Sequence, residues 1–461
     1  MLEESACCRG SQGPRSSPTI GISLSGGGHR ATLFSLGALL AIVDSGLNAS
    51  TCWIASVSGG SMANAMALAN GDFTRARPEQ FARACLDAIE RLAQRGAFTG
   101  ARFGYARFLL YLIALVVLPV VTYFTVTCLS LSWIFSVTAS AVVLLGILRV
   151  RGLLLETGVG RLWCSGSSTP LRRDDIPIEH LFVASDICHG KPIFLGNSYI
   201  GADGCIFRTG RLSLARAVRA SAAFPVLLPP VWLRLERHVR PLLPSRGMPK
   251  MTRGRLLLVD GGIYNNLGTD WPDYAQRMSR ANDNSVIRAA HREAVDWHLV
   301  VDSGFHTGVS SPLLHRMPVF GPIYTLTRIY KTTYTSVIDR VGNGSANQLL
   351  VSHTARPDSS LILPDILRLS ADEWSACAWT TLVEGTHFWH VQRKRALRIL
   401  AHGYALTVIR LTQCDSMQGL QINTAWNGDL GRAVKTALPI TKAEFRALYR
   451  RASGATEAAR T

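Results

Sequence analysis

The feature that most constrains this chain is a long stretch without charge, from Phe108 to Leu148, which contains no Asp, Glu, Lys, Arg or His. A backbone can lie in surroundings this apolar only when helices or closed sheets satisfy its hydrogen bonds. As one helix the stretch would be about 60 Å long, roughly twice the thickness of a bilayer's hydrocarbon core. The sequence therefore predicts two helices joined by a tight turn.

The predicted helices are Phe108–Val126 and Ser132–Leu148, and the turn between them carries no charge. Arg107 precedes the stretch and Arg149 follows it. Because Lys and Arg are enriched in cytoplasmic segments, both ends of the hairpin are expected in the cytoplasm. The prediction is an integral membrane protein whose remaining domain lies on the cytoplasmic side. The alternatives are a re-entrant or interfacial hairpin, or one that is buried in a soluble core.

The charge of the chain agrees with a membrane partner. The net charge is +18, although only 17% of the residues are charged and 48% are hydrophobic. The basic residues are scattered, without zinc-finger spacing or an aromatic RNA-binding signature, so no nucleic-acid partner is expected. An anionic membrane surface is the expected partner. The ten cysteines lack Cys-x-x-Cys spacing and fit a reducing compartment.

Two motifs near the N-terminus indicate ester chemistry. Apolar residues 19–24 lead into the glycines Gly26, Gly27 and Gly28, and a second apolar segment ends just before Ser58. Each motif is followed by a helical pattern, and this order predicts a parallel sheet covered by helices. Ser58 stands where a nucleophile elbow requires it. Glycines allow backbone N–H groups to approach an oxyanion closely.

Each motif departs from its simplest pattern or has a second interpretation. Ser56 occupies the first position of the elbow, where a Gly-x-Ser-x-Gly motif has glycine. Gly26-x-Gly28-x-x-Ala31 also matches a dinucleotide-binding fingerprint. That fingerprint requires an acidic residue at the end of the second strand, and this strand ends in Ser56-Val57-Ser58. The oxyanion interpretation is therefore preferred.

Asp260 is the candidate base for Ser58. It ends the apolar strand predicted at residues 256–259 and precedes two glycines, so its carboxylate is expected in a crevice at the edge of the sheet. Burial would raise its pKa above about 3.9 and make the carboxylate a more competent proton acceptor. The alternative is a Ser–His–Asp site with His306 or His390 as the base.

Four blocks of the sequence resemble the patatin-like phospholipases, lipid acyl hydrolases with a Ser–Asp dyad. They are Ser25-Gly26-Gly27-Gly28-His29-Arg30, the elbow at Ser58, Arg219-Ala220-Ser221-Ala222-Ala223-Phe224-Pro225 followed by Pro229-Pro230, and Asp260-Gly261-Gly262 followed by Asn265-Asn266. Their order and spacing agree over about residues 19–305, with the hydrophobic stretch as an insertion.

The resemblance implies a three-layer α/β/α fold and a mechanism without metal or cofactor. Ser58 would attack the carbonyl of a phospholipid or another acyl-ester lipid, and Asp260 would take its proton. The Gly26, Gly27 and Gly28 loop would hold the oxyanion, and Arg30 would brace that loop. The implied activity is that of a phospholipase A or lysophospholipase. An acyltransferase and a catalytically inactive lipid-binding scaffold are the remaining alternatives.

The predicted domain organisation has three parts. Residues 1–18 form a disordered tail, and residues 19–310 form the catalytic domain, which the hairpin at 108–148 interrupts. Residues 297–301 are predicted as a strand of that domain. Residues 311–461 form a mostly helical region, clearest over 371–411, which completes or covers the domain.

Overall fold

The structure is a computed structural model that describes about two thirds of the chain. The described residues are 18–95, 104–129, 132–202, 205–224, 228–234, 239–241, 255–281, 295–304, 347–354, 369–385, 390–413, 428–441 and 443–444. The predicted tail lies outside them except for Pro18, and so does His306.

The centre of the fold is a mixed sheet whose parallel half carries the predicted motifs. The order of its strands is β11–β10–β1–β2–β3, and each neighbouring pair is parallel. These strands are β1 (Ile20–Leu24), β2 (Thr51–Val57), β3 (Glu179–Asp186), β10 (Trp297–Asp302) and β11 (Gln348–Ser352). Nearly all residues of β1, β2 and β3 are buried, as in strands that are covered on both faces.

Beyond β3 the sheet becomes antiparallel. It continues through β4 (Lys191–Gly196), β5 (Tyr199–Ala202), β6 (Cys205–Thr209) and β8 (Val239–Pro241). The carboxyl end of β3 also pairs with β9 (Arg255–Asp260), and β9 pairs with β7 (Val231–Arg234). In this register Asp260 lies opposite Ala184 of β3.

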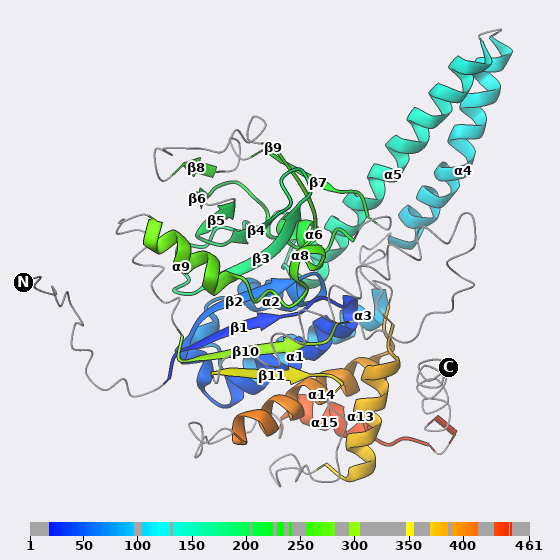
Figure 1. The fold of residues 1–461 in the computed structure, drawn as a ribbon. Coiled ribbons are helices and arrows are strands. Elements are labelled where there is room, and N and C mark those ends of the chain that lie inside the picture. Colours follow the sequence, from blue (N-terminus) through cyan, green and yellow to red (C-terminus); the bar gives the residue numbers. More distant parts are fainter. Residues whose placement is uncertain are drawn as a thin grey trace, which may run out of the picture.

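Helices cover both faces of the sheet and give three layers (Figure 1). One face is covered by α1 (Gly28–Asp44), α2 (Gly59–Ala69), α3 (Pro78–Arg95), α6 (Leu214–Ser221), α13 (Ala371–Val383), α14 (Arg393–Thr412) and α15 (Asp429–Ala437). The other face carries α9 (Trp271–Ala281), whose Trp271 and Tyr274 pack on Phe194. The three-layer α/β fold with a central mixed sheet confirms that part of the prediction.

Helices α1 and α14 pack closely beneath the parallel strands because glycines face the opposite backbone. A Cβ atom on Gly37 would lie 2.1 Å from the Leu400 carbonyl oxygen. A Cβ atom on Gly403 would lie 2.1 Å from the Phe34 carbonyl oxygen. The two glycines therefore allow α14 to pack directly against α1 in the core.

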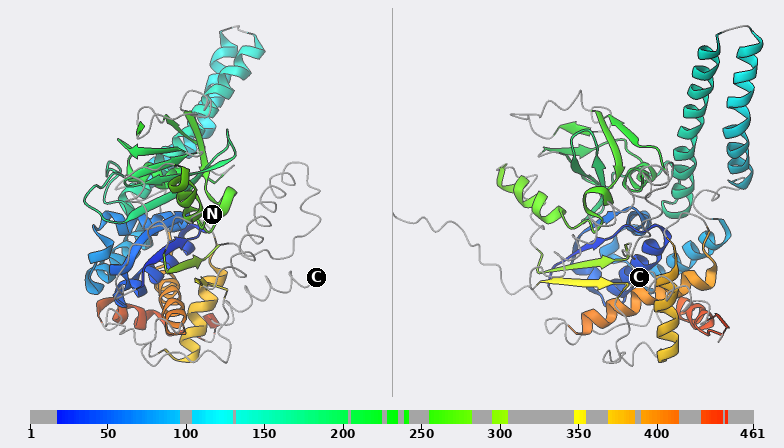
Figure 2. Two further views of the ribbon diagram at one scale, coloured as in Figure 1. Left: turned by 60° about the vertical axis from the view of Figure 1, so that its left-hand side comes forward. Right: turned by 45° about the vertical axis from the view of Figure 1, so that its right-hand side comes forward.

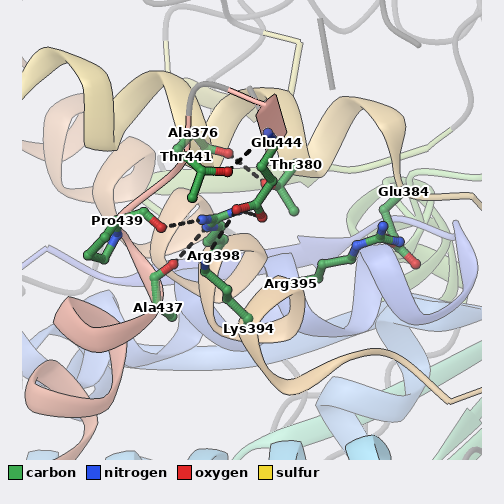
Figure 3. A network of polar contacts seen from close by, with 10 residues as sticks. All are labelled: Ala376, Thr380, Glu384, Lys394, Arg395, Arg398, Ala437, Pro439, Thr441 and Glu444. Atoms are coloured by element: carbon green, nitrogen blue, oxygen red, sulfur yellow. Dashed lines mark hydrogen bonds and ion pairs between the residues drawn. The ribbon is translucent and has the colours of Figure 1, made fainter. Parts of the chain in front are cut away.

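A buried arginine of α14 fixes the segment that follows α15 (Figure 3). The Arg398 guanidinium donates to the carbonyl oxygens of Ala437 at 2.8 Å and Pro439 at 3.0 Å. It also pairs with the Glu444 carboxylate at 2.7 Å, which Lys394 contacts at 3.2 Å. Because a buried guanidinium needs partners for its donors, this cluster holds the end of the described chain against α14.

Two antiparallel helices, α4 (Gly104–Cys128) and α5 (Trp133–Trp163), project from the body (Figures 1 and 2). The segment Leu109–Cys128 of α4 has the length and hydropathy needed to cross a membrane, and only 6% of it is buried. The apolar window of α5 is shorter, Trp133–Leu144.

The bounds of the second helix differ from the prediction. It does not end at Leu148 but continues past Arg149 into the body, where Leu155, Val159 and Leu162 are buried. Their helical spacing places these three side chains on one face, and that face packs against the core. One continuous helix therefore joins the hairpin to the rest of the protein.

Candidate active site

Ser58 occupies a strained turn between β2 and α2. Its φ of 49° and ψ of −112° are unusual for a residue with a side chain. A Cβ atom on Gly59 would lie 2.1 Å from the Gly28 carbonyl oxygen, so only glycine fits there. The Gly60 N–H donates to the Ser25 carbonyl at 3.1 Å. The turn is thus packed directly on the backbone of the glycine loop, and a nucleophile elbow has this geometry.

The register of the sheet brings Asp260 to Ser58. Val57 pairs with Val183 on β3, and Ala184, the next residue, pairs with Asp260 on β9. The Ser58 side chain is near enough to the Asp260 carboxylate to lower the pKa of Asp260. Two residues that lie far apart in the sequence therefore meet at the carboxyl end of β3.

The Asp260 carboxyl group is buried, and its electrostatics follow from that burial. Loss of water raises the pKa of Asp260 to about 6, against a smaller lowering by the hydrogen bond from the Gly262 N–H and by the nearby Ser58 side chain. The Gly262 N–H donates at 2.8 Å. The Asp260 N–H donates to the Ala223 carbonyl at 3.0 Å, and this bond holds the Asp260 backbone against the segment after α6. A carboxyl group with this pKa is ionised at neutral pH and can accept a proton.

The three predicted oxyanion glycines differ in what their N–H groups do. The Gly26 N–H donates to the Asn266 carbonyl at 3.0 Å and is therefore not available to a substrate. Within the described part of the chain, the N–H groups of Gly27 and Gly28 donate to no acceptor. Gly27 has a φ of 147°, and Gly28 begins α1 with a φ of 60°. Two N–H groups at a helix N-terminus form a natural site for negative charge.

Arg30, expected to brace the glycine loop, holds the segment on which the loop rests. Its guanidinium donates to the carbonyl oxygens of Gly304 at 2.6 Å, Ser303 at 3.3 Å and Glu384 at 3.0 Å. A Cβ atom on Gly27 would lie 2.4 Å from the same Ser303 oxygen. Arg30 thereby joins the end of β10 and the end of α13 beneath Gly27.

A buried hydroxyl network beneath Ser58 was not foreseen from the sequence. The Ser58 N–H donates to Ser221 Oγ at 3.1 Å, and Ser221 Oγ donates to the Val183 carbonyl at 2.6 Å. Ser61 Oγ lies 2.8 Å from Ser221 Oγ and 3.1 Å from Ser56 Oγ. Ser61 therefore lies between the two hydroxyls and donates its single proton to Ser56 Oγ. The signal in the sequence was Ser56 itself, the residue that departs from the elbow motif.

Ser56 fits its position because its side chain has polar partners. The hydroxyl donates to the Leu181 carbonyl at 2.8 Å and accepts from the Asn64 amide at 2.9 Å. Asn64 in turn lies 2.7 Å from His180 Nδ1. A serine in place of glycine is thus a satisfied buried group and does not disturb the turn.

The alternative base, a histidine, has little support among the described residues. His390 is exposed. The buried His402, His298 and His180 contact Thr381, Ser23 and Asn64 respectively. Asp260 is the ionisable group that the described structure brings to Ser58.

The fold and these contacts define an α/β protein with a strained serine turn beside a glycine-rich helix N-terminus. A family model described as patatin-like phospholipase matches residues 22–270, more than half of the chain. The chain therefore belongs to the patatin-like phospholipase family, a family of lipid hydrolases. This match confirms the family predicted from the four sequence blocks.

Three solved structures are similar to this chain at low identity. Human GIVD cytosolic phospholipase A2 is 14% identical with a TM-score of 0.37, over 91% of this chain and 60% of that one. Its complex with methyl gamma-linolenyl fluorophosphonate has the same identity and a TM-score of 0.35, over 91% and 59%. VipD from Legionella pneumophila is 11% identical with a TM-score of 0.32, over 91% and 74%. The chain spans less than two thirds of the human protein's length, and no curated protein sequence matches it.

Proposed function

We propose that this protein is a membrane-associated lipid acyl hydrolase of the phospholipase A or lysophospholipase type, with Ser58 and Asp260 as its catalytic dyad. The observation that carries the proposal is the register of the sheet, which brings the buried Asp260 carboxylate near enough to the Ser58 side chain for the pKa of Asp260 to be affected. The strained φ of Ser58 and the two N–H groups of Gly27 and Gly28 support it.

In the proposed reaction, Ser58 Oγ attacks the ester carbonyl carbon and passes its proton to the Asp260 carboxylate. The N–H groups of Gly27 and Gly28 hold the oxyanion of the tetrahedral intermediate. The intermediate collapses, and the alcohol leaves with the proton from Asp260. A water molecule then gives a proton to Asp260 and attacks the acyl carbonyl carbon on Ser58. The bond between that carbon and Ser58 Oγ breaks, Ser58 Oγ takes the proton back from Asp260, and the fatty acid is released.

The membrane part of the proposal rests on α4 and α5. Their exposed surface is apolar, with Leu110 and Val116 of α4 each 64% exposed and Trp133 of α5 72% exposed. Surface of this kind is unfavourable in water and matches a hydrocarbon environment. With arginines at both ends, the hairpin would place its turn outside and the catalytic body in the cytoplasm.

The test is labelling with a fluorophosphonate, which reacts with activated serines, in native membranes. We expect the wild type to be labelled and to release fatty acid from phospholipid vesicles. Ser58→Ala removes the attacking oxygen and should abolish both signals, whereas Asp260→Asn should reduce both by at least a hundredfold. Ser167→Ala changes an exposed serine and should leave both unchanged.

Persistent labelling of the Ser58→Ala variant would contradict the assignment of the nucleophile. A folded wild-type protein that is neither labelled nor active on a panel of lipids would favour the inactive lipid-binding scaffold. Transfer of the acyl group to an added alcohol, without release of free fatty acid, would favour the acyltransferase.

A further inference from the structure

The exposed face of the β7–β9 ribbon combines apolar and basic side chains. Trp232 is 54% exposed and pairs with Leu257 across the ribbon, and Arg234 pairs with Arg255. Ile187, which is 51% exposed, lies beside them, and its N–H donates to the Leu257 carbonyl at 3.1 Å. We call these five residues the ribbon surface.

The ribbon surface is unfavourable in water. Arginines directly opposite each other on a strand pair repel. In the described residues of β7 and β9 the only acidic side chain is Asp260, which is buried at the far end of β9. The exposed indole of Trp232 and the side chain of Ile187 add apolar area. A partner that is both anionic and partly apolar would relieve the repulsion and cover that area.

The ribbon surface lies near the base of the hairpin, where a bilayer surface would be (Figures 1 and 2). A Cβ atom on Gly152 of α5 would lie 2.9 Å from the Pro229 ring, so the two segments touch. Trp232 is three residues from Pro229, at most about 10 Å along a strand. Gly152 is only about 4.5 Å along the helix axis from Arg149, which marks the cytoplasmic end of the uncharged stretch.

We propose that the ribbon surface docks on the headgroup region of an anionic leaflet beside the inserted hairpin. Trp232 and Ile187 enter the interface, where Trp is enriched in membrane proteins, and Arg234 and Arg255 pair with lipid phosphates. This inference rests on the proposed insertion of the hairpin and adds a second contact with the same membrane.

Docking would act on the orientation of the catalytic body. Helix α6 is tied to α5 by the Arg219–Glu156 ion pair at 2.8 Å and to the ribbon by the Arg216 donor to the Trp232 carbonyl at 2.8 Å. The same helix carries Ser221, which accepts from the Ser58 N–H. Both membrane contacts therefore converge on the helix that supports the serine turn.

The direct test is tryptophan quenching in the full-length protein, reconstituted in vesicles whose lipids are brominated near the headgroup. The Trp232 component is the fluorescence lost in the Trp232→Phe variant. The brominated lipids should quench this component in vesicles that contain phosphatidylglycerol, and much less in vesicles of phosphatidylcholine alone. Trp297→Phe, at the start of β10, is the control, and the component that it removes should not be quenched. The measurement works in the Ser58→Ala background, so it does not depend on activity.

The second test compares two substrates. Arg234→Gln with Arg255→Gln should lower hydrolysis of phosphatidylglycerol-containing vesicles by roughly 30-fold, because each basic side chain near an anionic surface contributes about a fivefold preference. Hydrolysis of a soluble short-chain ester should not change. The control pair, Arg410→Gln with Lys435→Gln, removes the same charge from α14 and α15, away from the ribbon (Figure 1), and should leave both rates unchanged.

These experiments distinguish a failure of the docking proposal from a failure of the proposed function. A protein that is labelled at Ser58 but has no quenched Trp232 component overturns the docking and leaves the proposed function intact. A quenched Trp232 component in a wild-type protein that hydrolyses neither substrate supports the docking and counts against the enzyme. A vesicle-to-ester rate ratio that is unchanged by the double arginine variant overturns the role of Arg234 and Arg255.

Discussion

At the scale of single residues, the sequence predicts a role where a local motif marks the residue, and not where the role depends on contacts with other segments of the chain. Ser58 and Asp260 could be selected as partners because each ends a strand and is followed by glycines. The engagement of the Gly26 N–H by the Asn266 carbonyl could not be predicted, since it depends on the path of the loop after Asp260. Nor could the bond from the Ser56 hydroxyl to the Leu181 carbonyl, because these two residues are 125 positions apart in the sequence.

The pH dependence of catalysis should report the buried Asp260. Its pKa of about 6 means that the carboxylate loses its ability to accept a proton as the pH falls through 6. We expect kcat/KM on a soluble ester to fall tenfold per pH unit below about 6 and to be flat above it, which a pH–rate profile measures. A profile that stays flat down to pH 4.5 would mean that Asp260 is not the base.

Restoring the usual glycine at Ser56 should weaken the protein. Ser56→Gly removes a hydroxyl that accepts from Asn64 and leaves that buried amide with one partner fewer. The expected loss in the free energy of unfolding is about 1–3 kcal/mol, which urea denaturation measures. Ser56→Thr, which keeps the hydroxyl, is the comparison and should retain the hydrogen bonds if its extra methyl group fits. A gain in stability on Ser56→Gly would contradict this account of the network.

At the scale of elements, the strands and helices with strong local patterns were predictable, and those defined by distant partners were not. The strands predicted at 256–259 and 297–301 correspond to β9 and β10. The local sequence does not predict strand β11, because its place at the end of the parallel sheet depends on its pairing with β10. The end of α5 was predicted too early, because Arg149 interrupts the apolar run without ending the helix.

The close packing of α1 on α14 should make Gly403 intolerant of a side chain. Its Cβ would lie 2.1 Å from a backbone oxygen of α1, so Gly403→Ala must push the helices apart. We expect a loss of about 1–3 kcal/mol in the free energy of unfolding, the usual range for overpacking. Gly146→Ala on α5, where nothing lies within 4 Å, is the matched control and should not destabilise the protein. Equal melting temperatures for the two variants would refute the packing argument.

At the scale of the whole molecule, the hairpin and the body differ in whether their apolar side chains are exposed or buried. The body buries a continuous apolar core, whereas α4 exposes apolar side chains along most of its length. The uncharged stretch in the sequence is sufficient to predict this difference between the hairpin and the body. The contact of α5 with Pro229, on which the proposed orientation of the body at a membrane depends, could not be predicted from the sequence.

Two native cysteines can test the topology without any substitution. Cys128, at the end of α4, and Cys188, in the turn between β3 and β4, are both exposed. If the hairpin spans the membrane, a maleimide that cannot cross it should modify Cys128 but not Cys188 when it is added outside intact cells, as mapped by mass spectrometry of peptides. After detergent lysis both should react. A re-entrant hairpin would leave Cys128 within the bilayer and Cys188 on the cytoplasmic side, and neither thiol would react in intact cells.

The continuity of α5 has a kinetic consequence. Its 31 residues extend about 46 Å without a break from the hairpin turn to Trp163 in the core. If the hairpin is inserted as proposed, the body that α5 holds cannot leave the surface between turnovers. The rate of such an enzyme depends on the mole fraction of substrate lipid in the leaflet. It does not depend on the bulk concentration of lipid in the suspension. Diluting the substrate with an inert lipid should therefore slow the reaction, whereas diluting the whole suspension should not.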